Sequence, residues 1–220
     1  MTGPNATDLL ERAHTATLSP TRSILAIAGP PGSGKTTLAR WLSAALCRLA
    51  ESPICVAVPM DGFHLANTTL DALGRHEHKG REDTFDGWGF LALMKRILAE
   101  TEHTVYAPTF ERDVDEPIAG SLAIEPTTRL IVVEGNYLLM DHEPWISAQR
   151  LYRETWYVET APETRKKRLL ARHTEHGRTQ TAAREWIQRV DEKNAHGIAA
   201  TRTRATLIVP GDNDVSYRTP

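Results

Sequence analysis

The chain has 220 residues, of which 40% are hydrophobic and 25% charged, and its formal net charge at pH 7 is −2. This composition excludes a disordered chain and indicates one globular domain, and the balanced charge excludes a general attraction to nucleic acid or to anionic membranes. The two cysteines exclude a disulfide scaffold, and we find no apolar run of membrane-helix length and no secretory-signal pattern, so we expect a soluble, cytoplasmic protein.

Strand-like and helix-like patterns alternate along most of the chain. In chain order we expect a loose tail at 1–6, a helix at 7–17, a strand at 23–29, a helix at 35–50, a strand at 53–58, a helix at 89–100, strands at 127–133 and 155–159, helices at 162–173 and 181–191, and a last strand at 205–209. Thr160 and Glu163 have the spacing of a capping box, and Pro162 falls in the first turn of the helix that follows. The alternation predicts an α/β fold with a mostly parallel sheet covered by helices on both faces.

Three segments have less regular patterns, at 62–88, 101–126 and 174–180. In α/β proteins, the loops that handle ligands follow the carboxyl ends of the strands. We therefore expect substrate contacts and a lid in these segments.

The most specific motif lies between the first predicted strand and the helix after it. It fits G-x-x-x-x-G-K-[S/T] at every fixed position and comprises Gly29, Pro30, Pro31, Gly32, Ser33, Gly34, Lys35 and Thr36. Glycines allow close approach of the main chain to a phosphate, and successive N–H groups before a helix N-terminus form an anion-binding cradle. We predict that this loop and the adjacent Thr37 bind ATP, that Lys35 is catalytic and reaches the β- and γ-phosphates, and that the Thr36 hydroxyl ligates Mg²⁺.

Two acidic residues are predicted at the same edge of the sheet as this loop. Asp61 follows the second predicted strand, and Glu134 follows directly after the third. Because the carboxyl ends of parallel strands lie at one edge, both carboxylates should approach the γ-phosphate. One can orient or deprotonate an acceptor hydroxyl, for which we favour Asp61, and the other can hold Mg²⁺ together with Thr36, for which we favour Glu134. Capping of a turn by Asp61 or of a helix by Glu134 is the alternative interpretation.

Further motifs, taken in order, resemble those of one kinase family. They are Asp-Gly-Phe-His at 61–64, Lys-Gly-Arg-Glu-Asp-Thr-Phe-Asp at 79–86, Glu-Arg at 111–112 and Glu-Gly-Asn-Tyr-Leu-Leu at 134–139. With the phosphate loop, they resemble the uridine kinase, phosphoribulokinase and pantothenate kinase family over most of the chain, and most of all its kinases associated with fructose transport. The resemblance implies a P-loop NTPase fold, which is a three-layer sandwich with a mostly parallel sheet and a small helical lid. We interpret the chain as one domain, 1–220, with a tail and short helix at 1–20 and the lid and its following helix at 162–195.

The same resemblance implies ATP-dependent phosphorylation of a hydroxyl on a small metabolite, with Asp61 as the base. It places Lys79, Arg81, Asp83 and Arg112 near the acceptor, and we add His64, Glu134, Asn136 and Tyr137 as candidate substrate-binding residues. Local ion pairing is the alternative for Arg81 and Arg112. Residues 62–64 differ from the Ser-Phe-Tyr of uridine kinases, and the chain is short for a pantothenate kinase. Sugar-like, nucleoside and pantothenate-like acceptors therefore all stay open, with a sugar preferred.

A basic helix is predicted after the fourth strand. Arg165, Arg168 and Arg172 share one of its faces because they are spaced by three and four residues. Such a face can close over phosphates and stabilise the transferred charge, so we predict Arg168 and Arg172 as catalytic residues. A solvated basic face is the alternative interpretation.

Other functions also use a phosphate loop. A switch GTPase is disfavoured because the chain contains no Asn-Lys-x-Asp segment. An accessory ATPase without an acceptor and a mononucleotide kinase stay as alternatives to a small-molecule kinase. We expect a small alcohol as the partner, with no nucleic acid and no membrane, and the sequence leaves the oligomeric state open, a homodimer included.

Overall fold

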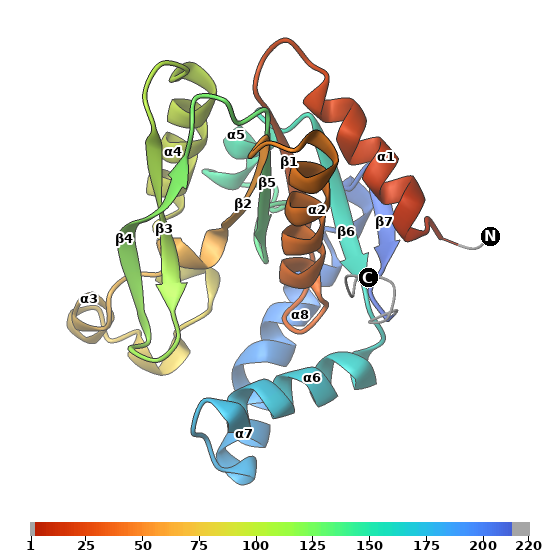
Figure 1. The fold of residues 1–220 in the computed structure, drawn as a ribbon. Helices are drawn as coiled ribbons and strands as arrows, with labels where there is room; N and C mark the ends of the chain where they lie inside the picture. The colour runs from red at the N-terminus through yellow and green to blue at the C-terminus, as the bar shows by residue number, and fades with distance from the viewer. Residues whose placement is uncertain (1–2, 213–220) are drawn as a thin grey trace.

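A computed structural model describes residues 3–212, and its centre is a parallel sheet of five strands (Figure 1). The strands are β1 (Ser23–Ala28), β2 (Cys55–Pro59), β5 (Leu130–Gly135), β6 (Glu154–Glu159) and β7 (Leu207–Pro210). They pair in the order β2-β5-β1-β6-β7, and each pair is parallel. The predicted α/β fold is confirmed. Residues 1 and 2 of the predicted tail lie outside the described residues.

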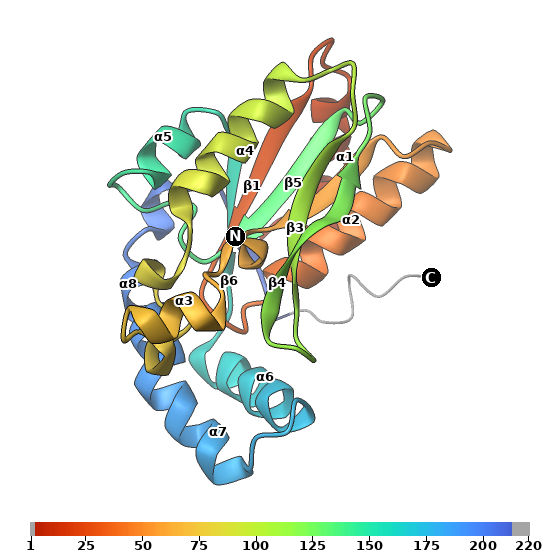
Figure 2. The same cartoon turned by 90° about the vertical axis from the view of Figure 1, so that its left-hand side faces the viewer.

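Helices cover both faces of this sheet. Apart from α3 (Asn67–Ala72), the α-helices of residues 3–212 are α1 (Ala6–Thr17), α2 (Lys35–Ala50), α4 (Gly87–Ala99), α5 (Trp145–Gln149), α6 (Pro162–Glu175), α7 (Gln180–Trp186) and α8 (Glu192–Ala199). In β1, Leu25 and Ile27 pack in one apolar cluster with α1 and α2, while Ile24 and Ala26 pack in a second cluster with α4 and α5. Figure 2 shows the sheet between these two pairs of helices. Burial on both sides explains why every residue of β1 and β5 is buried.

The segment 101–126, expected to be irregular, contains an antiparallel hairpin of β3 (Val105–Glu111) and β4 (Glu116–Ile124). Its strand pattern is weak because much of the ribbon is exposed and because Pro108 and Gly120 interrupt it. The hairpin packs closely on the turn after β2, since a Cβ added to Gly62 would lie 2.3 Å from the carbonyl oxygen of Pro108. The glycine after Asp61 therefore allows the hairpin to approach the site.

The predicted helix at 181–191 is α7 followed by a π-helical turn, Ile187–Asp191, which leads directly into α8. A π turn accommodates an extra residue within a helix and changes the direction of the side chains that follow. The capping box predicted at the start of α6 is wrong: Ala161 is the N-cap, and the Thr160 hydroxyl donates instead to the carbonyl oxygen of Ser33, at 2.8 Å. Pro162 does occupy the first turn of α6.

Two groups of elements lie on either side of the edge where the parallel strands end (Figure 1). One group is α6, α7 and α8. The other comprises η1 (Met60–Phe63), α3 (Asn67–Ala72), η2 (His76–His78), η3 (Glu82–Thr84) and the tip of the β3–β4 hairpin. Across residues 3–212, none of the helices combines the length and the hydrophobicity that crossing a membrane requires.

Candidate active site

The phosphate loop has the backbone conformation that its motif predicts. Gly32 and Gly34 have φ angles of +76° and +97°, in the left-handed region that other residues rarely adopt. Helix α2 begins at Lys35, so its N-terminus is directed at the loop. The Ser33 hydroxyl is buried and has no hydrogen-bond partner within residues 3–212, and a phosphate oxygen would satisfy it. The loop therefore fits a bound nucleotide phosphate.

Two arginines of α6 hold the outer side of this loop. Arg165 donates to the carbonyl oxygen of Pro31 at 3.0 Å, and Arg168 donates to those of Gly32 and Ser33, both at 3.3 Å. The structure therefore places Arg168 against the phosphate loop, and its predicted catalytic role stays a prediction. Its guanidinium binds carbonyl oxygens behind the loop, whereas a phosphate would lie against the N–H groups.

Asp61 and Glu134 lie at the carboxyl ends of two parallel strands at one edge of the sheet, as predicted, and these strands are neighbours. Asp61 lies in η1, directly after β2, and Glu134 lies near the end of β5, opposite Pro59 in the register of the sheet. Glu134 is buried and accepts a hydrogen bond from the Thr36 hydroxyl at 2.9 Å. A carboxylate and a hydroxyl suit Mg²⁺, which prefers oxygen ligands and keeps several waters or phosphate oxygens in its shell. Within residues 3–212, no group of three or more His, Cys, Asp and Glu side chains forms a metal site by itself.

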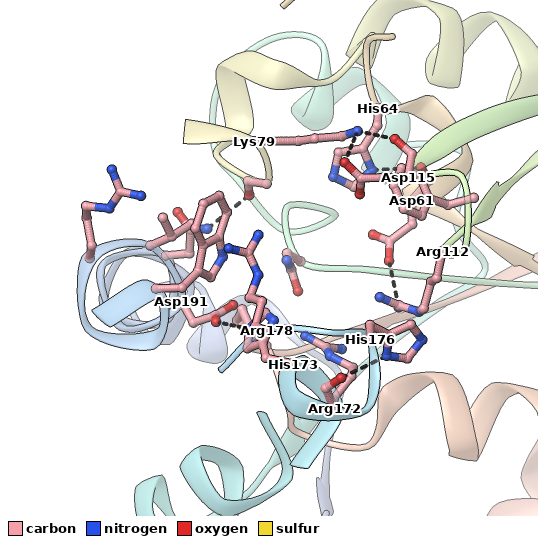
Figure 3. Close-up of a pocket in the computed structure, with 18 of the residues that line it drawn as sticks. Asp61, His64, Lys79, Arg112, Asp115, Arg172, His173, His176, Arg178 and Asp191 are labelled. Atoms are coloured by element: carbon pink, nitrogen blue, oxygen red, sulfur yellow. Dashed lines mark hydrogen bonds and ion pairs between the residues drawn. The ribbon is translucent and has the colours of Figure 1, made fainter. Parts of the chain in front are cut away.

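A cavity of about 920 Å³ opens in front of the phosphate loop (Figure 3). The predicted site residues that line it are Pro31, Lys35, Thr36, Asp61, His64, Lys79, Arg112, Glu134, Asn136 and Arg172. The side-chain oxygen of Asn136 is buried and has no partner within the described part of the chain. The cavity therefore brings together the phosphate-binding residues and most of the predicted acceptor-binding residues.

Burial and charge act differently on the ionisable groups beside the loop. Burial lowers the pKa of Lys35, although the carboxylates of Glu134 and Asp61 oppose the shift. Burial raises the pKa of Glu134, against the opposing charge of Lys35. Burial would also raise the pKa of Asp61, but the positive charges of Lys35, Arg112 and Arg172 oppose that shift, and the resulting pKa is lowered. Asp61 is therefore ionised at neutral pH and can accept a hydrogen bond from a hydroxyl group.

Two arginines line the cavity from different elements. Arg112, at the tip of the hairpin, has its Nη2 atom 3.8 Å from Oδ2 of Asp61. Arg172 comes from α6, and Figure 3 shows it on the opposite side of the cavity from Asp61. Within residues 3–212, the Arg172 side chain makes no hydrogen bond or ion pair, and burial lowers its pKa, with the charge of Arg112 acting in the same direction. Two guanidinium groups in one cavity favour an anionic ligand between them.

His64 lines the cavity beside Asp61. Its ring centroid lies 4.0 Å from that of Phe85 and 4.8 Å from that of Phe110. Its Nδ1 atom lies 2.8 Å from the carbonyl oxygen of Asp61. Because a carbonyl only accepts, Nδ1 carries the hydrogen, and burial lowers the pKa of His64, which favours the neutral ring. The Nε2 atom is then a hydrogen-bond acceptor.

Lys79 also lines the cavity, where it contacts two segments of the chain. Its Nζ atom donates to Oδ1 of Asn67 at 2.6 Å and lies 3.0 Å from Oδ2 of Asp115. It also lies 5.0 Å from the centre of the Phe110 ring. Lys79 is buried, and the Asp115 carboxylate balances its charge. Its contacts with Asn67 and Asp115 link the start of α3 to the turn of the hairpin.

Comparison with known proteins decides the family. Residues 24–216 match the family model described as "Phosphoribulokinase / Uridine kinase family". The chain belongs to this family. A Schizosaccharomyces pombe protein named "Putative uridine kinase" is 33% identical over 207 residues, which cover 92% of this chain and 87% of that protein. The "ATP-dependent kinase-like protein notR'" of Aspergillus versicolor is 38% identical over 162 residues, which cover 70% of this chain and 94% of that protein.

A solved structure agrees with this assignment. The crystal structure described as "putative fructose transport system kinase from Silicibacter sp. TM1040" has a TM-score of 0.81 and 36% identity, covering 91% of this chain and 98% of that one. The predicted family and fold are confirmed: the chain is a P-loop kinase of the phosphoribulokinase / uridine kinase family. The matches leave its acceptor unspecified.

Three of the predicted acceptor residues of this kinase lie outside the main cavity. Arg81 and Asp83 form an ion pair at 3.1 Å and line a second pocket, of about 680 Å³, together with Tyr137. Gly80, with a φ angle of +100°, turns the chain between Lys79 and Arg81, so that the two basic residues face different pockets. Their predicted contact with the acceptor stays a prediction, which this placement does not support.

The lid of the kinase contributes cavity residues to which the sequence patterns gave no role in the site. They are His173, Trp186, Asp191 and Asn194, with Arg178 lying 4.0 Å from the centre of the Trp186 ring. His173 Nε2 lies 2.8 Å from Oδ2 of Asp191. Their spacing matches no catalytic motif, so no sequence pattern indicated them.

Proposed function

We propose that this P-loop kinase transfers the γ-phosphoryl group of Mg²⁺-bound ATP to a hydroxyl group of a small polyhydroxylated metabolite. A sugar-like compound is our first choice of acceptor, followed by pantothenate-like alcohols and nucleosides. The observation that carries this proposal is the position of Asp61, an ionised carboxylate that lines the same cavity as Lys35 and Thr36. A kinase needs this combination of a phosphate cradle and a carboxylate facing the acceptor.

Each side chain has a defined task in this proposal. The N–H groups of residues 29–36 and the Lys35 ammonium would bind the phosphates. Asp61 would orient the acceptor hydroxyl and take its proton, and Arg172 and Arg112 would stabilise the charge of the phosphoryl group in transfer. Helices α6 to α8 would exclude water, which limits hydrolysis of ATP.

Thr36 and Glu134 are the residues that would hold Mg²⁺. Their oxygens lie 2.9 Å apart beside the loop, and the remaining ligands would be phosphate oxygens and water. When bound, Mg²⁺ neutralises charge on the β- and γ-phosphate oxygens.

The hydrogen-bonding groups of the cavity support a polyhydroxylated acceptor. Asp61, Nε2 of His64 and the unpartnered oxygen of Asn136 are all acceptors, and each can receive a hydrogen bond from a hydroxyl group. In the same wall, the charge of Lys79 is balanced by Asp115. A neutral compound with several hydroxyl groups therefore suits this end of the cavity.

A screen of acceptors tests the proposal. ADP release would be measured with Mg²⁺-ATP and a panel of sugars, polyols, nucleosides and pantothenate. We expect one class of compound to stimulate release, and Asp61→Asn to lower that stimulated rate about 10²- to 10⁴-fold, as for loss of a general base. Binding of a non-hydrolysable ATP analogue should be largely unchanged. The matched control is Asp113→Asn, an exposed carboxylate in the hairpin turn.

Two results would contradict the proposal. ATP turnover that no acceptor stimulates, and that Asp61→Asn does not change, would indicate an accessory ATPase. Stimulated turnover that survives in Asp61→Asn would remove the assignment of Asp61 as the base.

A further inference from the structure

Residues 191–194, where the π turn passes into α8, make two contacts with α6 and one with the turn at Gly80. Asp191 is buried and pairs with His173 of α6 through the 2.8 Å contact. Glu192 accepts a hydrogen bond at 2.9 Å from Arg165, also on α6. Asn194 Nδ2 donates to the carbonyl oxygen of Gly80 at 2.9 Å. We call residues 191–194 the junction.

On one side, the junction reaches the phosphate loop through a single side chain. Arg165 is buried, and its guanidinium binds Glu192 with one nitrogen and the carbonyl oxygen of Pro31 with the other. Helix α6 also packs directly on the loop, since a Cβ added to Gly32 would lie 2.8 Å from the carbonyl oxygen of Arg165. A displacement of the loop is therefore transmitted to α6 and to Glu192.

On the other side, the junction reaches the turn that directs Lys79 into the cavity. The carbonyl oxygen of Gly80 accepts from Asn194 and, at 2.7 Å, from the Tyr137 hydroxyl. Tyr137 follows β5, which carries Glu134, so this turn is held between the lid and the sheet. A movement of α8 would change the hydrogen bond from Asn194 to Gly80, because Asn194 belongs to that helix.

We infer that Arg165, Glu192 and Asn194 are positioning residues that couple nucleotide binding at the phosphate loop to the order of the acceptor segment, residues 76–85. This inference rests on the proposed function, because it takes ATP as the ligand of the loop. Coupling requires a continuous series of packed contacts, and the series from Pro31 to Gly80 consists of hydrogen bonds between buried or partly buried groups. A second link, between Arg189 and Glu77 at 3.3 Å, is exposed and should contribute little.

Hydrogen–deuterium exchange tests the coupling without knowledge of the acceptor. The full chain would be compared with and without adenylyl imidodiphosphate and Mg²⁺. In the wild type, we expect the nucleotide to slow exchange at residues 29–37 and also at residues 76–85, the latter about fivefold or more, the lower end of typical coupling between sites. In Asn194→Ala, slowing at 29–37 should persist and slowing at 76–85 should be lost.

Further variants separate coupling from a general loss of structure. Glu192→Gln should also lose the slowing at 76–85, because Arg165 loses its charged partner. Glu175→Gln makes the same chemical change at the exposed end of α6 and should behave as the wild type. Thermal unfolding of each variant reports its folding, and if Asn194→Ala does not fold, Asn194→Ser and Glu192→Gln provide the same comparison.

The outcomes distinguish this inference from the proposed function. If the nucleotide slows exchange only at 29–37 in the wild type, or if slowing at 76–85 persists in Asn194→Ala and Glu192→Gln, the coupling is overturned while the kinase proposal stands. If the wild type does not bind the nucleotide, the proposed function fails, and the coupling fails with it.

Discussion

The two sides of the cavity are constructed differently. On the sheet side, Lys35, Asp61 and Glu134 lie within two residues of the end of a buried strand or the start of α2, so the main chain sets their positions. On the lid side, Arg172 and Asn194 depend on contacts between helices and loops that are far apart in the sequence. Substitutions of these three sheet-side residues should therefore alter binding or chemistry selectively, whereas lid-side substitutions that break a contact between elements should also alter how the site is assembled.

The largest effect is expected at Lys35. Lys35→Ala removes the ammonium group that faces the phosphates, and we expect affinity for an ATP analogue to fall about 10²- to 10³-fold, the typical effect of removing one preorganised phosphate or oxyanion contact. Calorimetric titration would measure the affinity, and thermal unfolding should show a stable fold. Near-normal affinity in a folded variant would show that the main-chain cradle alone binds the nucleotide.

Arg168 and Arg172 of α6 provide the sharpest comparison within the lid. Arg172→Ala should lower acceptor-stimulated turnover about 100-fold, with little change in melting temperature, since its guanidinium has no partner within residues 3–212. Arg168→Ala should lower the melting temperature and weaken nucleotide binding, because it releases carbonyl oxygens of the loop. Steady-state kinetics and differential scanning fluorimetry would separate the two. If Arg168→Ala lowered turnover without a change in melting temperature and Arg172→Ala lowered the melting temperature, Arg168 would be the catalytic residue of the two.

A substitution of Gly62 tests the close packing of the β3–β4 hairpin against the turn after β2. In Gly62→Ala, the added Cβ would overlap the carbonyl oxygen of Pro108, and we expect a loss of about 1–3 kcal/mol in the free energy of unfolding, as for overpacking elsewhere. Urea denaturation would measure it. Gly197→Ala is the control, because a Cβ there meets open space and its φ is not positive. Equal losses in the two variants would contradict the close contact.

The smallest effect concerns pH. Burial raises the pKa of Glu134, so this carboxylate takes up a proton at a higher pH than an exposed glutamate, and the protonated acid is a poor ligand for Mg²⁺. The gain in ATP-analogue affinity that Mg²⁺ provides should be present above the raised pKa and lost as the pH falls through it. Titrations with and without Mg²⁺ would measure the gain, and Glu134→Gln should show little gain at any pH. A gain in the wild type that is constant down to the ordinary pKa of a glutamate would contradict the role of Glu134.

The sequence predicts best those features whose positions depend on residues close together in the chain. The phosphate loop, the five strands and the positions of Asp61 and Glu134 follow from hydrophobic runs and from the geometry of parallel strands, in which neighbouring carboxyl ends share one edge. The hairpin was missed because its strands are half exposed. Arg168 and Arg172 have equivalent spacing on one helix, and only the packing of α6 against the loop decides which of them reaches the cavity.

The π turn before α8 has a consequence for the divergence of related kinases. One residue more or less in a helix rotates every later side chain by about 100°, since an α-helix has 3.6 residues per turn. Deleting a residue from Ile187–Asp191 would redirect Glu192 and Asn194 together, with no change to the sequence of the phosphate loop. Relatives with identical nucleotide-binding motifs can therefore evolve different acceptor preferences through a single insertion or deletion in this helix.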